Sequence, residues 1–236
     1  SANGTATAGV DYTAISGTLT FLAGETSKTV TVLVNGDLIE ENNETFTVGL
    51  SNRTPADVLI TFADSSGLGT INNDDAVAIS INDVTLAEGN AGTTSFTFTV
   101  SLDNTSEQTI TVDYASANGT ATAGVDYTAI SGTLTFLAGE TSKQVTVLVN
   151  GDLIEENNET FTVALSNKTP GADADISIGD GSGLGTINND DSVAISINDV
   201  TLSEGNAGTT SFTFTISLSN ASDQTITVDY ASANGT

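Results

Sequence analysis

The stretch GTLTFLAGETSKQVTVLVNGDLIEENNETFTVALSN, residues 132–167, decides the fold of this chain. It contains three runs, TLTF, QVTVLV and TFTVALS, in which apolar residues recur at every second position and Thr fills many of the others. Such alternation is typical of β-strands with one buried face, and Thr, Val and Phe favour the strand conformation. The stretch therefore predicts three half-buried strands, with Phe136, Val147 and Phe161 among the inward residues.

The same pattern continues on both sides of this stretch, in VAISI (77–81), SFTFTVSL (95–102), TITVDY (109–114) and GLGTI (183–187). The dipeptides Asn118-Gly119 and Asn150-Gly151 predict turns, because both residue types tolerate positive φ. About seven short strands in roughly 100 residues are typical of an immunoglobulin-like β-sandwich. We therefore expect an all-β fold.

Internal repetition predicts the domain organisation. The first 28 residues recur from residue 116, VAISINDVTL begins at residues 77 and 193, and GTINNDD closes a block at residues 75 and 191. This phase divides the chain into the later part of one repeat (1–75), a complete repeat (76–191) and the first part of a third (192–236). The segments after Pro55 and Pro170 differ between the copies, so we expect a variable loop there.

Composition excludes several classes of function. Thirty acidic residues face four basic ones, a net charge of -26, which disfavours binding to nucleic acid or to an anionic membrane. No apolar stretch reaches the roughly 20 residues of a membrane-spanning helix, so we expect no direct membrane insertion. Because Cys, His, Met and Trp are all absent, thiol and imidazole chemistry is excluded and we expect no enzyme. The remaining oxygen ligands suit Ca²⁺.

The acidic residues gather at the expected strand ends and form the candidate metal site. In the complete repeat and the third repeat the candidates are Glu88, Asp126, Asp152, Glu156, Glu159, Asp190, Asp191 and Glu204, and in the first they are Asp11, Asp37, Glu41, Asp74 and Asp75. If these loops meet at one end of a sandwich, their mutual repulsion favours a bound cation. The alternative from composition alone is solvated loop charge that maintains solubility.

A family resemblance bears on this choice. EGNAGTTSFTFTVSL, GTATAGVDY, residues 132–167 and GTINNDD, taken in order, resemble the Calx-β domain over the whole of 76–191 and part of both flanks. The resemblance implies an immunoglobulin-like sandwich of the kind found in sodium-calcium exchangers and in long bacterial surface arrays. It also implies calcium ligands at Glu88, Asp126, Asp152, Glu156, Glu159, Asp190 and Asp191. Asn150-Gly151 and Asn188-Asn189 stand where strong binders have acids, which implies fewer ions or an affinity near ~10⁻⁴–10⁻³ M.

These patterns predict a mechanical role. Similar sandwiches in series make a rod whose stiffness depends on the junctions. We expect an extracellular or cell-surface filament, stalk or adhesin of a bacterium, stiffened by Ca²⁺, with neighbouring copies of the repeat as partners. Residues 192–236 and 1–75 are complementary, so we expect either a section of a longer polypeptide or chains that complete each other by strand exchange. The alternatives are an adhesive module for carbohydrate or protein, with an unknown surface ligand, and a calcium-sensing regulatory domain.

Overall fold

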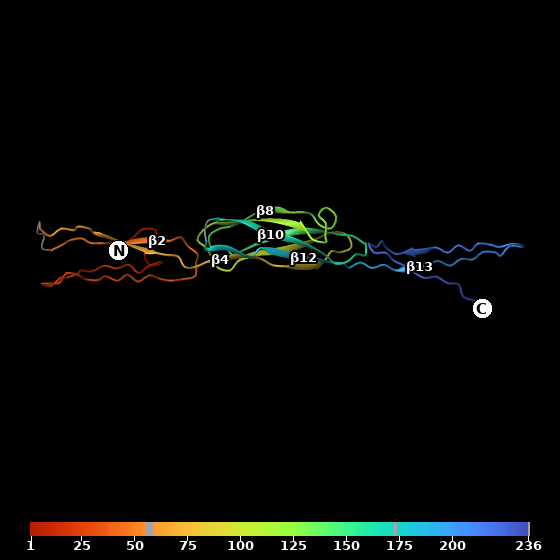
Figure 1. Ribbon diagram of the computed structural model, residues 1–236, viewed down its shortest axis with the longest axis horizontal. Coiled ribbons are helices and arrows are strands. Elements are labelled where there is room, and N and C mark those ends of the chain that lie inside the picture. The colour runs from red at the N-terminus through yellow and green to blue at the C-terminus, as the bar shows by residue number, and fades with distance from the viewer. Residues whose placement is uncertain (55–58, 172–173, 236) are drawn as a thin grey trace.

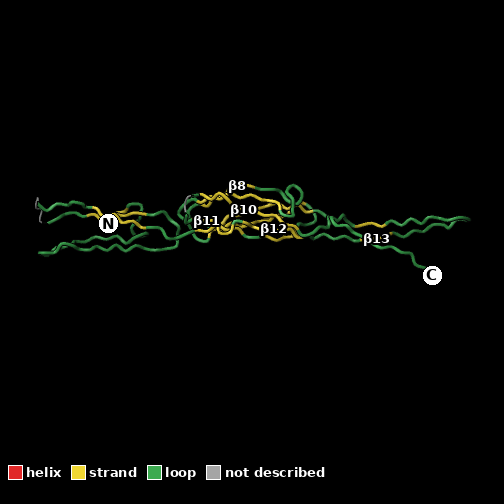
Figure 2. Tube along the Cα trace, in the orientation of Figure 1, coloured by secondary structure: helices red, strands yellow, loops and turns green. Residues whose placement is uncertain are grey.

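The computed structural model describes residues 1–54, 59–171 and 174–235 as strands, turns and loops. Three parts lie in a row along the long axis, with residues 76–191 in the middle (Figure 1). Most of the strand structure is in the middle part, and the flanks are largely extended loop (Figure 2). The described residues contain no helix that is long and apolar enough to cross a membrane.

The middle repeat is a sandwich of two sheets. One sheet has the order β11-β4-β6-β9 and contains β4 (Val77–Ile81), β6 (Gly92–Leu102), β9 (Ser142–Gly151) and β11 (Ile176–Asp180). The other has the order β5-β12-β10-β7-β8 and contains β5 (Val84–Ala87), β7 (Ile110–Asn118), β8 (Ser131–Phe136), β10 (Glu159–Thr169) and β12 (Ser182–Asn188). The seven runs predicted from alternation all form strands, and the all-β sandwich is confirmed.

Two short edge strands, β5 and β11, join these seven in the described part of the repeat. The prediction of a variable loop after Pro170 is wrong for residues 176–180, because they form β11. Asp173, in the same segment, lies outside the described residues. Strand β11 pairs in parallel with β4, and Ile176 is only 1% exposed. Its partner lies about 100 residues earlier in the chain, so the local sequence gives little sign of the pairing.

The prediction of a turn at Asn150-Gly151 is also wrong, because both residues belong to the end of β9 and pair with Thr93 and Gly92 of β6. A Cβ atom on Gly151 would lie 2.0 Å from the carbonyl oxygen of Gly89. The glycine is needed there because the end of β9 lies very close to the loop between β5 and β6. Asn118-Gly119, by contrast, lies where β7 ends, as predicted.

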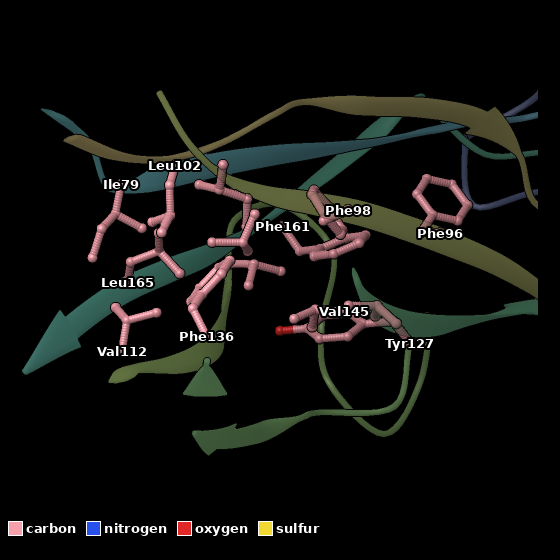
Figure 3. Close-up of a cluster of buried hydrophobic side chains, with 14 of the residues drawn as sticks. Ile79, Phe96, Phe98, Leu102, Val112, Tyr127, Phe136, Val145, Phe161 and Leu165 are labelled. Atoms are coloured by element: carbon pink, nitrogen blue, oxygen red, sulfur yellow. The ribbon is translucent and has the colours of Figure 1, made fainter. Parts of the chain in front are cut away.

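The core lies between the two sheets of the middle repeat. Phe161 is fully buried, and its ring centroid lies 5.8 Å from that of Phe96, 6.0 Å from that of Phe98 and 4.7 Å from that of Tyr127. Figure 3 shows these rings among the branched aliphatic side chains of both sheets. Phe136, Val147 and Phe161, which the alternation predicts to point inward, are fully buried.

The flanking parts contain fewer strands. Residues 1–75 form β1 (Ala2–Asn3), β2 (Glu44–Gly49) and β3 (Ser66–Ile71), and residues 192–235 form β13 (Ile195–Ile197) and β14 (Ile216–Leu218). Within the described residues of this first part, 1–54 and 59–75, no strand corresponds to β4, β5 or β6. Phe21 is accordingly 54% exposed, whereas Phe136, at the same place in the middle repeat, is fully buried.

Candidate metal centre

Asp126 is positioned by the tyrosine that follows it. Tyr127 is fully buried, stacks on Phe161 and donates a hydrogen bond from its hydroxyl to Asn118 Oδ1 at 2.7 Å. The loop before it closes on itself, since the Thr122 amide donates to Asp126 Oδ2 at 2.6 Å. The Tyr127 side chain therefore anchors the loop in the core, and the Asp126 side chain presents its carboxylate at the end of the sandwich.

Asn150 connects the Asp126 loop to the acidic loop between β9 and β10. Its backbone amide donates to the Asp126 carbonyl at 2.8 Å, and its side-chain amide donates to the Val125 carbonyl. Two residues further on, Asp152 Oδ1 accepts a hydrogen bond from the Ile154 amide at 2.7 Å. A carboxylate at position 150 could not donate to Val125, so the asparagine has a structural role.

The closing segment after β12 is held to both neighbouring loops. The Asn189 amide donates to Asn158 Oδ1 at 3.1 Å, and its side chain donates to the Asp191 carbonyl at 3.0 Å. Asp190 Oδ1 accepts a hydrogen bond from the Gly89 amide at 3.1 Å. These contacts bring segments about 100 residues apart in sequence to the same end of the repeat.

Carboxylates gather in two clusters at this end. In each cluster, one oxygen from each of three side chains lies within 4.8 Å of the other two. The loop cluster consists of Asp126, Glu156 and Glu159, and the closing cluster consists of Glu88, Asp190 and Asp191. Asp152 influences both, because its charge raises the pKa of Glu156 in the first and of Glu88 in the second.

The pKa values show the cost of this arrangement without a cation. Burial, followed by repulsion from Glu156 and Asp152, raises the pKa of Glu88 from 4.5 to about 7. Burial and then Asp126 raise the pKa of Glu159 to about 7 as well. Because burial and like charges both disfavour ionisation, each of these clusters favours proton or cation binding.

Three carboxylate oxygens are buried without a hydrogen-bond partner among the described residues: Glu44 Oε2, Glu159 Oε2 and Asp191 Oδ2. Burying such oxygens without a partner is costly. All potential metal ligands in the clusters are oxygen atoms, and calcium prefers six to eight oxygen ligands. The residues therefore fit calcium, with the remaining ligands to come from backbone carbonyls or water.

The first repeat contains the counterpart of the loop cluster, formed by Asp11, Glu41 and Glu44. The predicted residues Asp37, Asp74 and Asp75 line the same hollow as Glu41 and Glu44. Of the candidates predicted from the sequence, Glu204 joins no carboxylate cluster in the described part of the chain. It lies in the third repeat, where its carbonyl accepts a hydrogen bond from the Thr210 hydroxyl at 2.5 Å.

Two acids near the loop clusters were not predicted, and each belongs to the next repeat. Burial is the largest cause that raises the pKa of Glu41 to about 7, and repulsion from Glu107 is the second largest. Burial, then Asp152 and then Asp223 raise the pKa of Glu156. Asp223 is also the last of the causes, after burial, Asp126 and Glu156, that raise the pKa of Glu159. The sequence feature that could have identified these two acids is their recurrence between Ser and Gln, in residues 106–108 and 222–224.

The fold and these clusters define a class of protein, a tandem β-sandwich with carboxylate clusters at the ends of its repeats. The sequence profile of the Calx-beta domain matches residues 1–68 and 72–184. The chain therefore belongs to the Calx-beta domain family.

Two relatives illustrate how widely the domain is used. The chain is 46% identical over 59 residues to sodium/calcium exchanger 1 of Canis lupus familiaris, a match that covers 25% of this chain and 6% of the exchanger. It is 26% identical over 167 residues to adhesion G-protein coupled receptor V1 of Danio rerio, covering 69% of this chain and 3% of the receptor. The chain thus spans only a small part of the length of either relative.

Solved structures of Calx domains are also similar to this chain. The apo-form Calx CBD1 domain has a TM-score of 0.44 and 22% identity, covering 50% of this chain and 100% of that domain. The calcium binding domain CBD12 of CALX1.1 has a TM-score of 0.43 and 22% identity, covering 54% of this chain and 53% of that one.

Proposed function

We propose that this chain is a structural section of an extracellular array of Calx-beta repeats, ordered by calcium at the ends and junctions of the repeats. One observation supports the proposal above all: buried carboxylate oxygens without hydrogen-bond partners among the described residues lie in the three-carboxylate clusters of the first and middle repeats. That arrangement is unfavourable for a metal-free protein.

Calcium would be held by Asp126, Glu156 and Glu159 in the loop cluster and by Glu88, Asp190 and Asp191 in the closing cluster. The charge of Asp152 acts on both clusters. A bound ion supplies positive charge and accepts the lone pairs that no protein donor satisfies. The chain's own residues provide the mechanical consequence. Asp190 and Asp191 lead directly into residues 192–236, so ordering the closing cluster also orders the path into the next repeat.

A structural role outside the cell is supported by the sequence more than by any one site. Residues 1–28 and 116–143 are identical, which favours length over separate functions for each repeat. Imidazole and thiol chemistry is not available, since the chain lacks His and Cys, and we propose that it has no enzymatic activity. The bacterial surface and neighbouring repeats remain the proposed location and partners.

A regulatory calcium sensor is the second candidate function. It is favoured by the 46% identity, over 59 residues, to a sodium/calcium exchanger. A sensor should respond to calcium in the micromolar range of cytosolic signals, whereas an extracellular module needs ~10⁻⁴–10⁻³ M. The measured affinity therefore separates the two candidates.

The test is thermal unfolding of the full chain in chelator and in about 10 mM calcium, with affinity measured by calorimetry. For a dissociation constant of ~10⁻⁴ M, linkage predicts about 2.7 kcal/mol of stabilisation per site. We expect calcium to raise the unfolding midpoint. Asp126→Asn, Asp152→Asn and Asp190→Asn together should abolish the part of the rise that comes from the middle repeat, and the cluster of the first repeat should keep its own share.

Glu140→Gln is the matched control, because Glu140 is a partly exposed acid paired with Lys143 at 2.7 Å, outside both clusters. This variant should keep the full calcium response. An unchanged midpoint for the unsubstituted chain in calcium would mean that the carboxylates are solvated surface charge. The rigidity of the array would then come from strand pairing and packing alone.

A further inference from the structure

A buried glutamate crosses the junction between the first and middle repeats. Glu40 belongs to the acidic loop of the first repeat, yet its side chain is completely buried. Its Oε1 accepts a hydrogen bond from Gln108 Nε2 at 2.8 Å, and its Oε2 accepts one from the Ser106 hydroxyl. Both partners belong to the middle repeat, so the burial of Glu40 depends on the neighbouring repeat.

The backbone reinforces this contact. The Glu40 amide donates to the Thr105 carbonyl at 3.0 Å, and the Glu107 amide donates to the Glu40 carbonyl at 3.0 Å, which forms a one-residue parallel bridge between the repeats. The turn that contacts Glu40 is also held by a hydrogen bond of its own, since the Gln108 amide donates to Ser106 Oγ at 2.9 Å. Glu40 thus binds through both its main chain and its side chain.

The second junction repeats these hydrogen bonds around Glu155, which is half-buried. Glu155 Oε2 accepts from the Ser222 hydroxyl at 2.6 Å, and Glu155 Oε1 accepts from Gln224 Nε2 at 3.3 Å. The amides of Glu155 and Asp223 form the same bridge, at 3.1 and 3.0 Å. Between the two turns Thr105 becomes Ala221 and Glu107 becomes Asp223, whereas the Ser and Gln that contact the glutamate are the same in both.

A buried carboxylate needs a complete set of donors, because an unpaired charge of this kind costs far more than an exposed one. Within residues 1–54 and 59–75, no donor to the Glu40 carboxylate is found, and the donors come from Ser106 and Gln108. A repeat turned or displaced at the junction would leave the carboxylate without them. The contact therefore selects one orientation of the next repeat.

We propose that Glu40 and Glu155 are recognition residues by which each repeat docks on the next copy, and that the Ser-x-Gln turn is their receptor. This contact, here called the junction latch, consists of protein groups alone. It fixes the direction and register of neighbouring repeats before any cation binds. It also brings Glu107 and Asp223 beside the loop clusters of the preceding repeats. The latch stands independently of the proposed calcium function.

The test measures the first junction of the full chain in chelator. Because the chain has no cysteine, Ser66→Cys and Gln144→Cys provide two exposed sites for spin labels, one in each repeat. Pulsed electron paramagnetic resonance then gives the distribution of distances between the labels. We expect one narrow peak for the otherwise unsubstituted chain and loss of that peak in Glu40→Ala.

Glu155→Ala is the matched control, because it breaks the second latch and should leave the narrow peak across the first junction unchanged. The double variant Ser106→Ala with Gln108→Ala tests the receptor side, and circular dichroism verifies that each variant is folded. A narrow peak that persists in folded Glu40→Ala, or a broad distribution without substitution in chelator, would overturn the proposal. Neither result depends on whether calcium binds.

Discussion

Asn150 and Asn189 show how single side chains shape the acidic end of a repeat. Their side-chain amides donate to the carbonyls of Val125 and Asp191, which a carboxylate could not do. The Asn150 side chain holds two neighbouring loops together, the Asn189 side chain closes its own loop, and neither adds negative charge to the clusters. This chemistry agrees with the weak calcium affinity that the sequence predicts for extracellular modules of this kind.

Glu88 leads to a prediction about pH. Its pKa is 4.5 ordinarily and about 7 in the folded chain, so the folded state holds the proton more tightly than the unfolded state. The stabilisation from this proton is full below pH about 4.5, falls as the pH rises towards about 7, and is absent above that. The metal-free chain should therefore have a higher free energy of unfolding at pH about 5 than at pH about 7.5, as measured with urea.

Glu88→Gln should reduce this pH dependence, and the part that remains belongs to Glu159 and Glu41, whose pKa burial also raises to about 7. Glu204→Gln is the control, since Glu204 occupies the same Glu-Gly motif in the third repeat but joins no carboxylate cluster among the described residues. It should leave the pH dependence as it is. If Glu88→Gln retains the full dependence, the cause lies in other carboxylates and not in Glu88.

At the scale of elements, the closing strand β12 and the core depend on each other. Gly185 of β12 lies over the Phe161 ring, and a Cβ atom there would be 2.4 Å from Phe161 Cζ. The ring is already in contact with Phe96, Phe98 and Tyr127, so it has little room to move. Alternation predicts a strand here, but only the packing explains why the strand carries a glycine.

Gly185→Ala should therefore destabilise the middle repeat by about 1–3 kcal/mol, the usual cost of overpacking a core. Urea unfolding followed by circular dichroism measures the effect. In Gly67→Ala the new Cβ would meet its nearest atom at 3.9 Å, an ordinary contact, so this variant serves as the control in a strand of the first repeat. Equal stability of the Gly185 variant and the control would show that the ring can move aside.

At the scale of the whole molecule, charge and repetition act together. Three parts lie in a row and share a net charge of -26 (Figure 1). Diffuse repulsion of this kind is screened by any salt, with a Debye length of about 10 Å at 0.1 M. A cluster whose oxygens lie within 4.8 Å of one another instead favours a divalent ion at a particular place.

We therefore expect millimolar calcium to order the full chain more than sodium chloride does at an ionic strength about a hundred times higher. Small-angle scattering and rotational diffusion both measure the change in flexibility. Magnesium is an informative comparison, because it has the same charge but requires a small octahedral site and releases its water reluctantly. Equal effects of sodium and calcium would assign the ordering to screening alone.

Much of this protein is determined by its sequence. Period-two alternation places the inward residues of seven strands, because a strand directs successive side chains to opposite faces and only one face is apolar. The acids of the candidate site are also evident, since they interrupt these runs. Tertiary structure alone decides which of them meet. Glu88 joins Asp190, and β11 pairs with β4, across about 100 residues. Glu40 becomes buried only because its donors lie in the next repeat.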